Sequence, residues 1–233
     1  NRLLLSAHPE RARIHLTTAT YTNPAQPPNF CMYLRRHLEG ARLKQLTRPE
    51  GERIVHFHFS GRDELGDERE LLVIVETMGK HSNIIVVNQE QNTILIAIKS
   101  VTANMSRYRQ VLPGLLYKSP PPQERLPLAD LSELKFYSEL PQHGRRPAKA
   151  LLSTVAGLSP LWAQELVTRA NLPENLDIQS ASRDELALLW QELAAFHQTL
   201  EQTSFDPMVY LQPSGRAMTV APLCLVQYSS LPA

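Results

Sequence analysis

The chain has 233 residues, of which 42% are hydrophobic, and its 24 Lys and Arg nearly balance its 23 Asp and Glu. This length allows one large domain or two smaller ones, and the hydrophobic content suffices for buried cores. No apolar run approaches the length of a membrane span, and the two widely separated cysteines exclude a disulfide framework. We therefore expect a cytoplasmic protein that does not interact with membranes.

The small net charge conceals an uneven distribution along the chain. Residues 1–62 contain ten Lys or Arg and four Asp or Glu, whereas residues 171–206 are acidic. A polyanionic partner such as RNA is therefore expected to bind the first half of the chain.

Short β-branched runs and one amphipathic helix predict an α+β first domain. Residues at 11–17 and 53–59 alternate in the manner of strands, and the runs at 71–75 and 84–87 are uniformly apolar, so we expect an antiparallel meander with the helix packed against it. The predicted helix covers residues 30–39, and the predicted strands cover residues 3–6, 11–17, 53–59, 71–75, 84–87 and 93–99.

His56 and His58 share one face of the predicted strand at 53–59. Such a pair can hold a metal ion, but no carboxylate or third histidine follows at a ligand spacing. We therefore predict no metal site, and nothing in the sequence indicates another cofactor.

The polar connection between the strands at 71–75 and 84–87 is the main candidate binding segment. It reads Glu76-Thr77-Met78-Gly79-Lys80-His81-Ser82-Asn83. Gly79 accounts for the bend, and the four residues after it supply a cation, a titratable ring and hydrogen-bonding groups, which suit phosphate or RNA. The alternative is an ordinary polar hairpin turn.

Arg107-Tyr108-Arg109 places an aromatic ring between two guanidinium groups. Such groups can stack on bases and pair with phosphates, although more often they form a solvated surface. The proline-rich, irregular stretch that continues to Arg146 predicts a linker.

The second half of the chain reads as helical. Helices predicted at 149–156 and 161–170 flank Gly157-Leu158-Ser159-Pro160, with Ser159 as N-cap. This pattern is typical of a helix-hairpin-helix motif, whose turn presents backbone N–H groups to a phosphate, and a plain αα-hairpin is the alternative. A capping box, Ser182 to Glu185, then begins a helix, and a hairpin follows at 208–220.

Five blocks in this order resemble the N-terminal half of the NFACT family, also called fibronectin-binding protein A: LLLSAHPERARIHLT, NPAQPPNFCMYLRRHLEG, GERIVHFHF, ETMGKHSNIIVVN and YRQVLPGLLYKSPPP. The resemblance implies a domain similar in fold to the N-terminal domain of formamidopyrimidine-DNA glycosylases at residues 1–128. An all-α helix-hairpin-helix domain is implied at 129–205, and a terminal hairpin at 206–233 leads toward a coiled coil. Because the chain opens in a strand without Met, we also expect preceding residues.

The resemblance implies an RNA-binding module of ribosome quality control that has no catalytic residues of its own. Family members bind the obstructed large ribosomal subunit with its rRNA, recruit tRNA, here alanine tRNA, and support C-terminal alanine tailing of stalled chains. The family usually has Asp-Arg where this chain has Glu52-Arg53, and Arg is frequent at the Lys80 position.

The predicted RNA-binding residues combine these positions with those selected above. They are Glu52, Arg53, Glu76, Met78, Gly79, Lys80, His81, Ser82, Asn83, Arg107 and Arg109, with Gly157, Leu158 and Ser159 at the helix-hairpin-helix turn. Two other functions remain open. The family's older name suggests a surface adhesin that binds fibronectin. The implied fold suggests a DNA glycosylase-like enzyme, which needs an N-terminal nucleophilic amine and usually a zinc finger, and the sequence shows neither.

Overall fold

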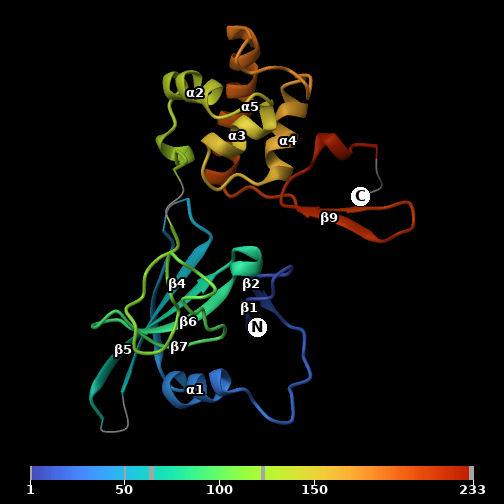
Figure 1. The fold of residues 1–233 in the computed structure, drawn as a ribbon. Coiled ribbons are helices and arrows are strands. Elements are labelled where there is room, and N and C mark those ends of the chain that lie inside the picture. The colour runs from blue at the N-terminus through green and yellow to red at the C-terminus, as the bar shows by residue number, and fades with distance from the viewer. Residues whose placement is uncertain (1, 50, 63–65, 122–123, 231–233) are drawn as a thin grey trace. The chain divides into compact units, whose positions relative to one another are not determined.

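The computed structural model describes residues 2–49, 51–62, 66–121 and 124–230. The chain divides into two compact units, residues 1–122 and 123–233 (Figure 1). The first unit combines antiparallel sheets with a helix, which confirms the predicted α+β class. The further likeness to glycosylase N-terminal domains stays a prediction.

A five-stranded antiparallel sheet forms the body of the first unit, in the order β3-β4-β5-β6-β7. Four of its strands confirm the predicted meander, whereas β3 was not predicted. All residues of β3 except Thr47 are exposed, so this edge strand lacks the apolar alternation that marks a half-buried strand. The strands are β3 (Arg42–Thr47), β4 (Ile54–Arg62), β5 (Glu68–Glu76), β6 (Asn83–Asn88) and β7 (Thr93–Ala97).

Each face of this sheet has its own apolar core. One face carries Phe57, Val73 and Val86, and it is covered by α1 (Asn29–Leu38) and by the hairpin of β1 (Arg2–Ser6) and β2 (Arg13–Thr17). This hairpin and this helix were both predicted. The opposite face carries Ile54, Ile74 and Ile85 and is covered by the segment 101–117.

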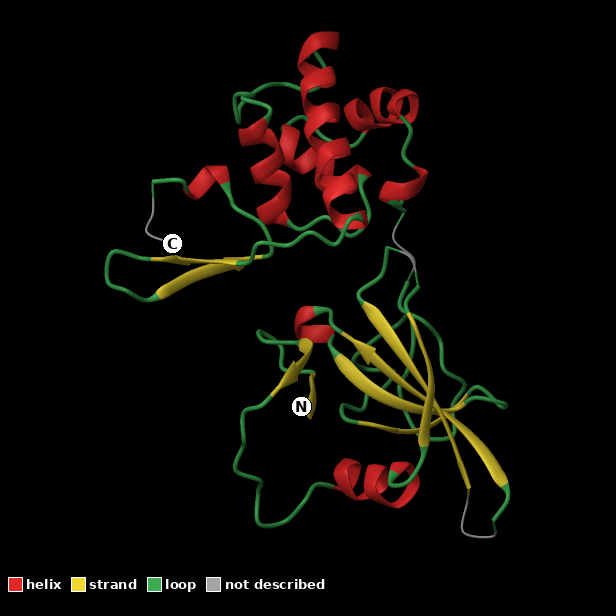
Figure 2. Cartoon of the chain, turned by 180° about the vertical axis from the view of Figure 1, so that it is seen from behind, coloured by secondary structure: helices red, strands yellow, loops and turns green. Residues whose placement is uncertain are grey.

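The second unit contains four α-helices and a two-stranded hairpin in its described part (Figure 2). They are α2 (Glu133–Glu139), α3 (Pro147–Thr154), α4 (Pro160–Arg169), α5 (Arg183–Glu201), β8 (Met208–Leu211) and β9 (Ala217–Ala221). The predicted N-cap at Ser159 and the capping box at Ser182 are confirmed. None of the helices described is long and apolar enough to cross a membrane.

The prediction of an irregular linker up to Arg146 was wrong. Helix α2 lies in this stretch, and Phe136 and Leu140 are fully buried in the helical core. The many prolines nearby suggested a linker, but Ser132 accepts a hydrogen bond from the Lys135 amide and so caps α2.

Candidate nucleic-acid interface

One end of the five-stranded sheet brings together segments that are distant in the sequence. Ile54 pairs with Glu76, and Glu76 pairs with Asn83, across β4, β5 and β6. The amide and the hydroxyl of Thr77 both donate to the carbonyl of Arg53, at 2.9 and 3.0 Å. The Glu52-Arg53 pair and the segment 76–83 are therefore side by side.

The segment between β5 and β6 contains one turn of 3-10 helix, η1 (Gly79–His81). Gly79 has a φ of 56°, a left-handed conformation that side-chain-bearing residues rarely adopt, so the predicted bend is confirmed. The Ser82 hydroxyl oxygen accepts a hydrogen bond from the Met78 amide at 2.8 Å and closes the turn. Lys80 and His81 are exposed at its tip.

Asn83 ties this turn to the chain that follows β7. Its side-chain oxygen accepts hydrogen bonds from the amides of Ile84 and Lys99, both at 3.0 Å, and its nitrogen donates to the Lys99 carbonyl at 2.8 Å. The Lys99 ammonium donates to the carbonyl of Ala7 at 2.6 Å, beside the β1–β2 turn. Asn83 and Lys99 together therefore link the start of β6, the chain after β7 and the residue after the β1 strand.

Glu76 forms a buried network with Arg109 and Tyr117. Its fully buried carboxylate accepts two hydrogen bonds from the Arg109 guanidinium, at 2.6 and 2.7 Å, and one from the Tyr117 hydroxyl at 3.0 Å. Burial raises the pKa of Tyr117, and the Glu76 charge raises it further. Burial lowers the pKa of Arg109, but hydrogen bonds and charge from Glu76 outweigh this, so that its pKa is raised overall.

The predicted RNA-binding residues of the first unit therefore divide into three groups by their exposure. The polar atoms of Glu76, Ser82 and Asn83 are buried and bonded within the chain, and Arg109 is paired with Glu76, so these four position their neighbours. Glu52 and Met78 are half-buried. The exposed members are Arg53, Gly79, Lys80, His81 and Arg107.

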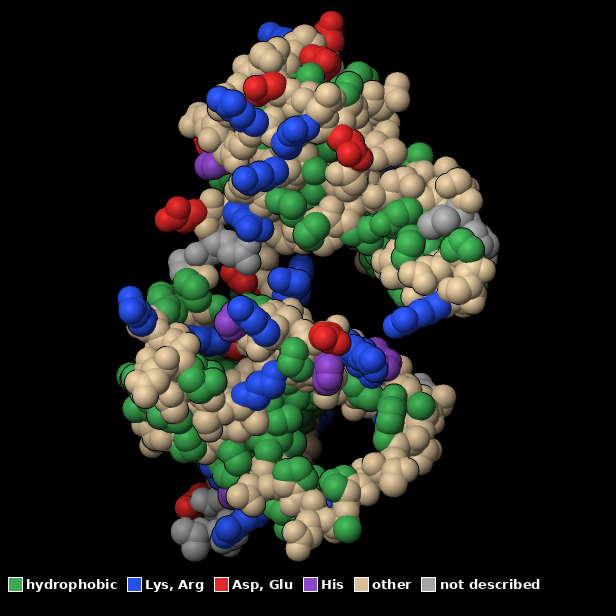
Figure 3. Space-filling model, turned by 45° about the vertical axis from the view of Figure 1, so that its right-hand side comes forward, with side chains coloured by type: hydrophobic (Ala, Val, Ile, Leu, Met, Phe, Trp, Pro, Cys, Tyr) green, Lys and Arg blue, Asp and Glu red, His purple; other side chains and the backbone are tan. Residues whose placement is uncertain are grey.

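The exposed members lie in a unit whose surface is rich in cations. In Figure 3, several Lys, Arg and His side chains lie along the upper part of the first unit, with few Asp or Glu among them. An anionic partner would meet an attractive field there.

His56 and His58 lie on β4, and the His58 ring links this strand to β3 and to the turn after β6. The His58 ring lies 3.0 Å from the Thr47 hydroxyl and 2.9 Å from the Gln89 side-chain oxygen. Burial lowers the pKa of His56, and His58 lowers it further. No group of three potential metal ligands occurs within the described residues.

In the second unit, Gly157, Leu158 and Ser159 join α3 to α4. Gly157 has a φ of 77°, Leu158 is buried in the helical core, and the Ser159 hydroxyl accepts a hydrogen bond from the Trp162 amide at 3.3 Å. The two helices thus form an αα-hairpin with a capped second helix. Its use as a phosphate-binding helix-hairpin-helix turn stays a prediction.

Comparison with known proteins gives a consistent set of relatives. Residues 1–231 match the family described as NFACT N-terminal and middle domains. The Rqc2 homolog RqcH of Bacillus subtilis is 40% identical over 77% of this chain and 32% of its own length. The Rqc2 homolog RqcH of Streptococcus pneumoniae is 36% identical over 92% of this chain and 37% of its own length. The chain therefore spans about a third of the length of these relatives.

A solved structure resembles the chain over nearly its whole length. It is the N-terminal part of the fibronectin/fibrinogen-binding protein from Streptococcus suis, with 32% identity and a TM-score of 0.74. The similarity covers 99% of this chain and 76% of that chain.

Proposed function

The chain belongs to the NFACT family, and from this premise we propose that it is the RNA-binding module of a ribosome quality-control factor. Its proposed partners are the obstructed large ribosomal subunit, with its rRNA, and tRNA, in particular alanine tRNA. The module would act in the cytoplasm and support C-terminal alanine tailing of stalled chains. It positions RNA and contributes no catalytic residue or cofactor of its own.

The observation that supports this proposal most directly is that two exposed cations are carried by neighbouring segments at one end of the sheet. Arg53 and Lys80 are both exposed, and the Thr77 contacts to the Arg53 carbonyl join their segments. Guanidinium and ammonium groups are the usual phosphate contacts in nucleic-acid complexes. The buried network of Glu76 and the bonds of Asn83 fix the backbone beneath these cations, which lowers the ordering cost of binding.

We expect Arg53→Ala and Lys80→Ala each to weaken the binding of tRNA to the chain. Each substitution removes one phosphate contact, so the slope of log affinity against log salt concentration should fall in magnitude by about 1. Fluorescence anisotropy with labelled tRNA over a salt series measures both quantities.

Arg42→Ala provides a matched control in the same unit. Arg42 is also exposed, but its strand partner Ser60 lies about 20 Å along β4 from Ile54, because a strand rises by about 3.3 Å per residue. The Arg42→Ala variant should bind tRNA with the affinity of the parent chain. Parental affinity in both Arg53→Ala and Lys80→Ala would contradict the proposed site, and an equal loss in Arg42→Ala would indicate non-specific charge attraction.

Fibronectin is the second candidate partner, because the similar structure from Streptococcus suis is that of a fibronectin/fibrinogen-binding protein. A solid-phase assay with purified fibronectin, with tRNA as competitor, separates the two functions. Fibronectin binding that tRNA does not displace, and that the Arg53→Ala/Lys80→Ala variant retains, would favour a separate protein-binding surface.

A further inference from the structure

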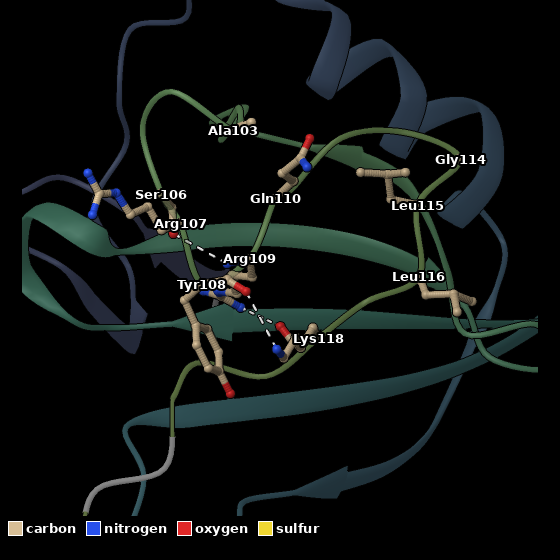
Figure 4. Close-up of a pocket in the computed structure, with 10 residues that line it drawn as sticks. All are labelled: Ala103, Ser106, Arg107, Tyr108, Arg109, Gln110, Gly114, Leu115, Leu116 and Lys118. Carbon is tan, nitrogen blue, oxygen red and sulfur yellow. Dashed lines mark hydrogen bonds between the residues drawn. The ribbon is translucent and has the colours of Figure 1, made fainter.

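Residues 103–118, which follow β7, line an open groove of about 680 Å³. Figure 4 shows that two stretches of this segment, 103–110 and 114–118, form its walls. The lining includes Ser106, Arg107, Tyr108, Leu115, Leu116 and Lys118.

Backbone contacts with the sheet and within the segment hold both walls in place. Val101 and Val111 exchange two backbone hydrogen bonds at 2.8 and 3.1 Å, and the Gly114 amide donates to the Ile94 carbonyl at 2.8 Å. Arg109 connects the walls, because its guanidinium binds Glu76 and also donates to the Lys118 carbonyl at 2.8 Å. The groove is therefore formed before any ligand enters it.

The lining has the chemistry of a nucleotide site. Arg107 and Lys118 supply positive charge, Arg109 is neutralised by Glu76, and none of the described residues that line the groove is a carboxylate. The Lys118 ammonium lies 3.9 Å from the centre of the Tyr108 ring, as Figure 4 illustrates. Tyr108 remains 42% exposed, so ring area is still open to a flat ligand.

We propose that this groove binds an unpaired nucleotide, with the base against Tyr108 and the phosphate paired with the Lys118 ammonium. The inference rests on the proposed RNA-binding function and specifies a single-stranded segment as the ligand. In a duplex both faces of a base are covered by its neighbours, so only an unpaired base can stack on a protein ring. The apolar side chains of Leu115 and Leu116, 39% and 68% exposed, extend the surface available to the base.

Anisotropy measurements with a single-stranded hexaribonucleotide and a blunt RNA duplex test this site. Tyr108→Ala should weaken hexaribonucleotide binding by about tenfold, the loss typical for one stacked base, and leave duplex binding unchanged. Tyr108→Phe keeps the ring and should retain the parental affinity. Tyr21→Ala is the matched control, because Tyr21 is 53% exposed in the same unit but lies outside the groove.

The outcomes separate this inference from the function on which it rests. Unchanged hexaribonucleotide binding in Tyr108→Ala, while Arg53→Ala and Lys80→Ala still weaken tRNA binding, would overturn the groove and leave the proposed function standing. Failure of the parent chain to bind any RNA would overturn both. An acidic hexapeptide that binds as tightly as the hexaribonucleotide, with the same loss in Tyr108→Ala, would overturn the nucleotide assignment in favour of a protein partner.

Discussion

Glu76→Ala should lower the free energy of unfolding of the first unit by about 3–5 kcal/mol, the range observed when one partner of a buried ion pair is removed. The Arg109 side chain is only 12% exposed and would lose its counter-charge, while the Tyr117 hydroxyl would lose its acceptor. Urea denaturation followed by circular dichroism, together with amide hydrogen exchange in β4, β5 and β6, measures the loss.

The second unit provides an internal control for this experiment. Both tryptophans, Trp162 and Trp190, lie in the second unit, so the fluorescence transition should not change in Glu76→Ala. The triple variant Glu76→Leu/Arg109→Met/Tyr117→Phe should recover most of the stability, because apolar replacements of buried ion pairs are often neutral. Parental exchange rates in β5 and β6 of Glu76→Ala would show that the network does not stabilise the sheet.

The stabilisation by Glu76 should persist at alkaline pH. The pKa values of Arg109 and Tyr117 are both raised in the folded chain. When the pKa of a group is higher in the folded state than in the unfolded state, its contribution to stability is complete below the unfolded-state pKa. This contribution is lost as the pH rises from that value through the folded-state pKa. Since an unfolded tyrosine titrates near 10, the difference between the parent and Glu76→Ala should stay constant from pH 7 to about 9.

Elements with a local signal could be predicted from the sequence. Ser159 before Pro160, the Ser182 to Glu185 capping box and the bend at Gly79 each depend on the chemistry of a few adjacent residues, and each appears in the structure. Strand β4 was predicted from its alternating pattern, and β5 and β6 were predicted as short apolar runs rich in β-branched residues, because both faces of the sheet are buried there. The exposed edge strand β3 carries no such pattern.

The pairing within the candidate site could not be predicted in this way. Arg109 stands 33 residues and Tyr117 stands 41 residues after Glu76, and a single sequence contains no signal that these side chains meet. The flanking aromatic residue made Arg109 look like an RNA contact equal to Arg107. Burial separates the two arginines, and burial depends on how the segment 101–117 crosses the sheet.

Glu165→Ala should lower the free energy of unfolding of the second unit by about 3 kcal/mol. The carboxylate of Glu165 is fully buried in α4 and accepts hydrogen bonds from Arg169 Nε at 2.7 Å and from the amides of Val226 and Gln227 at 2.7 and 3.1 Å. Each donor left without a partner costs about 1–3 kcal/mol, and Arg169 costs less because its side chain is 33% exposed to water. The tryptophan transition in urea measures this loss, since Trp162 packs beside the cluster that holds Tyr210 and Leu225.

Hydrogen exchange measures whether Glu165 holds the segment around Val226 and Gln227 against α4. The amides of Val226 and Gln227 should lose protection in Glu165→Ala, whereas Glu165→Gln should lose less stability because its side-chain oxygen still accepts from one of them. Glu201→Ala is the matched control, because the Glu201 side chain is 67% exposed and its removal should change stability by less than about 0.5 kcal/mol. If the amides of Val226 and Gln227 stay protected in Glu165→Ala and the urea transition equals that of the parent, the proposed role of Glu165 is wrong. The segment would then be held by the apolar packing of Leu225, and the hydrogen bonds of the buried carboxylate would only offset the cost of its desolvation.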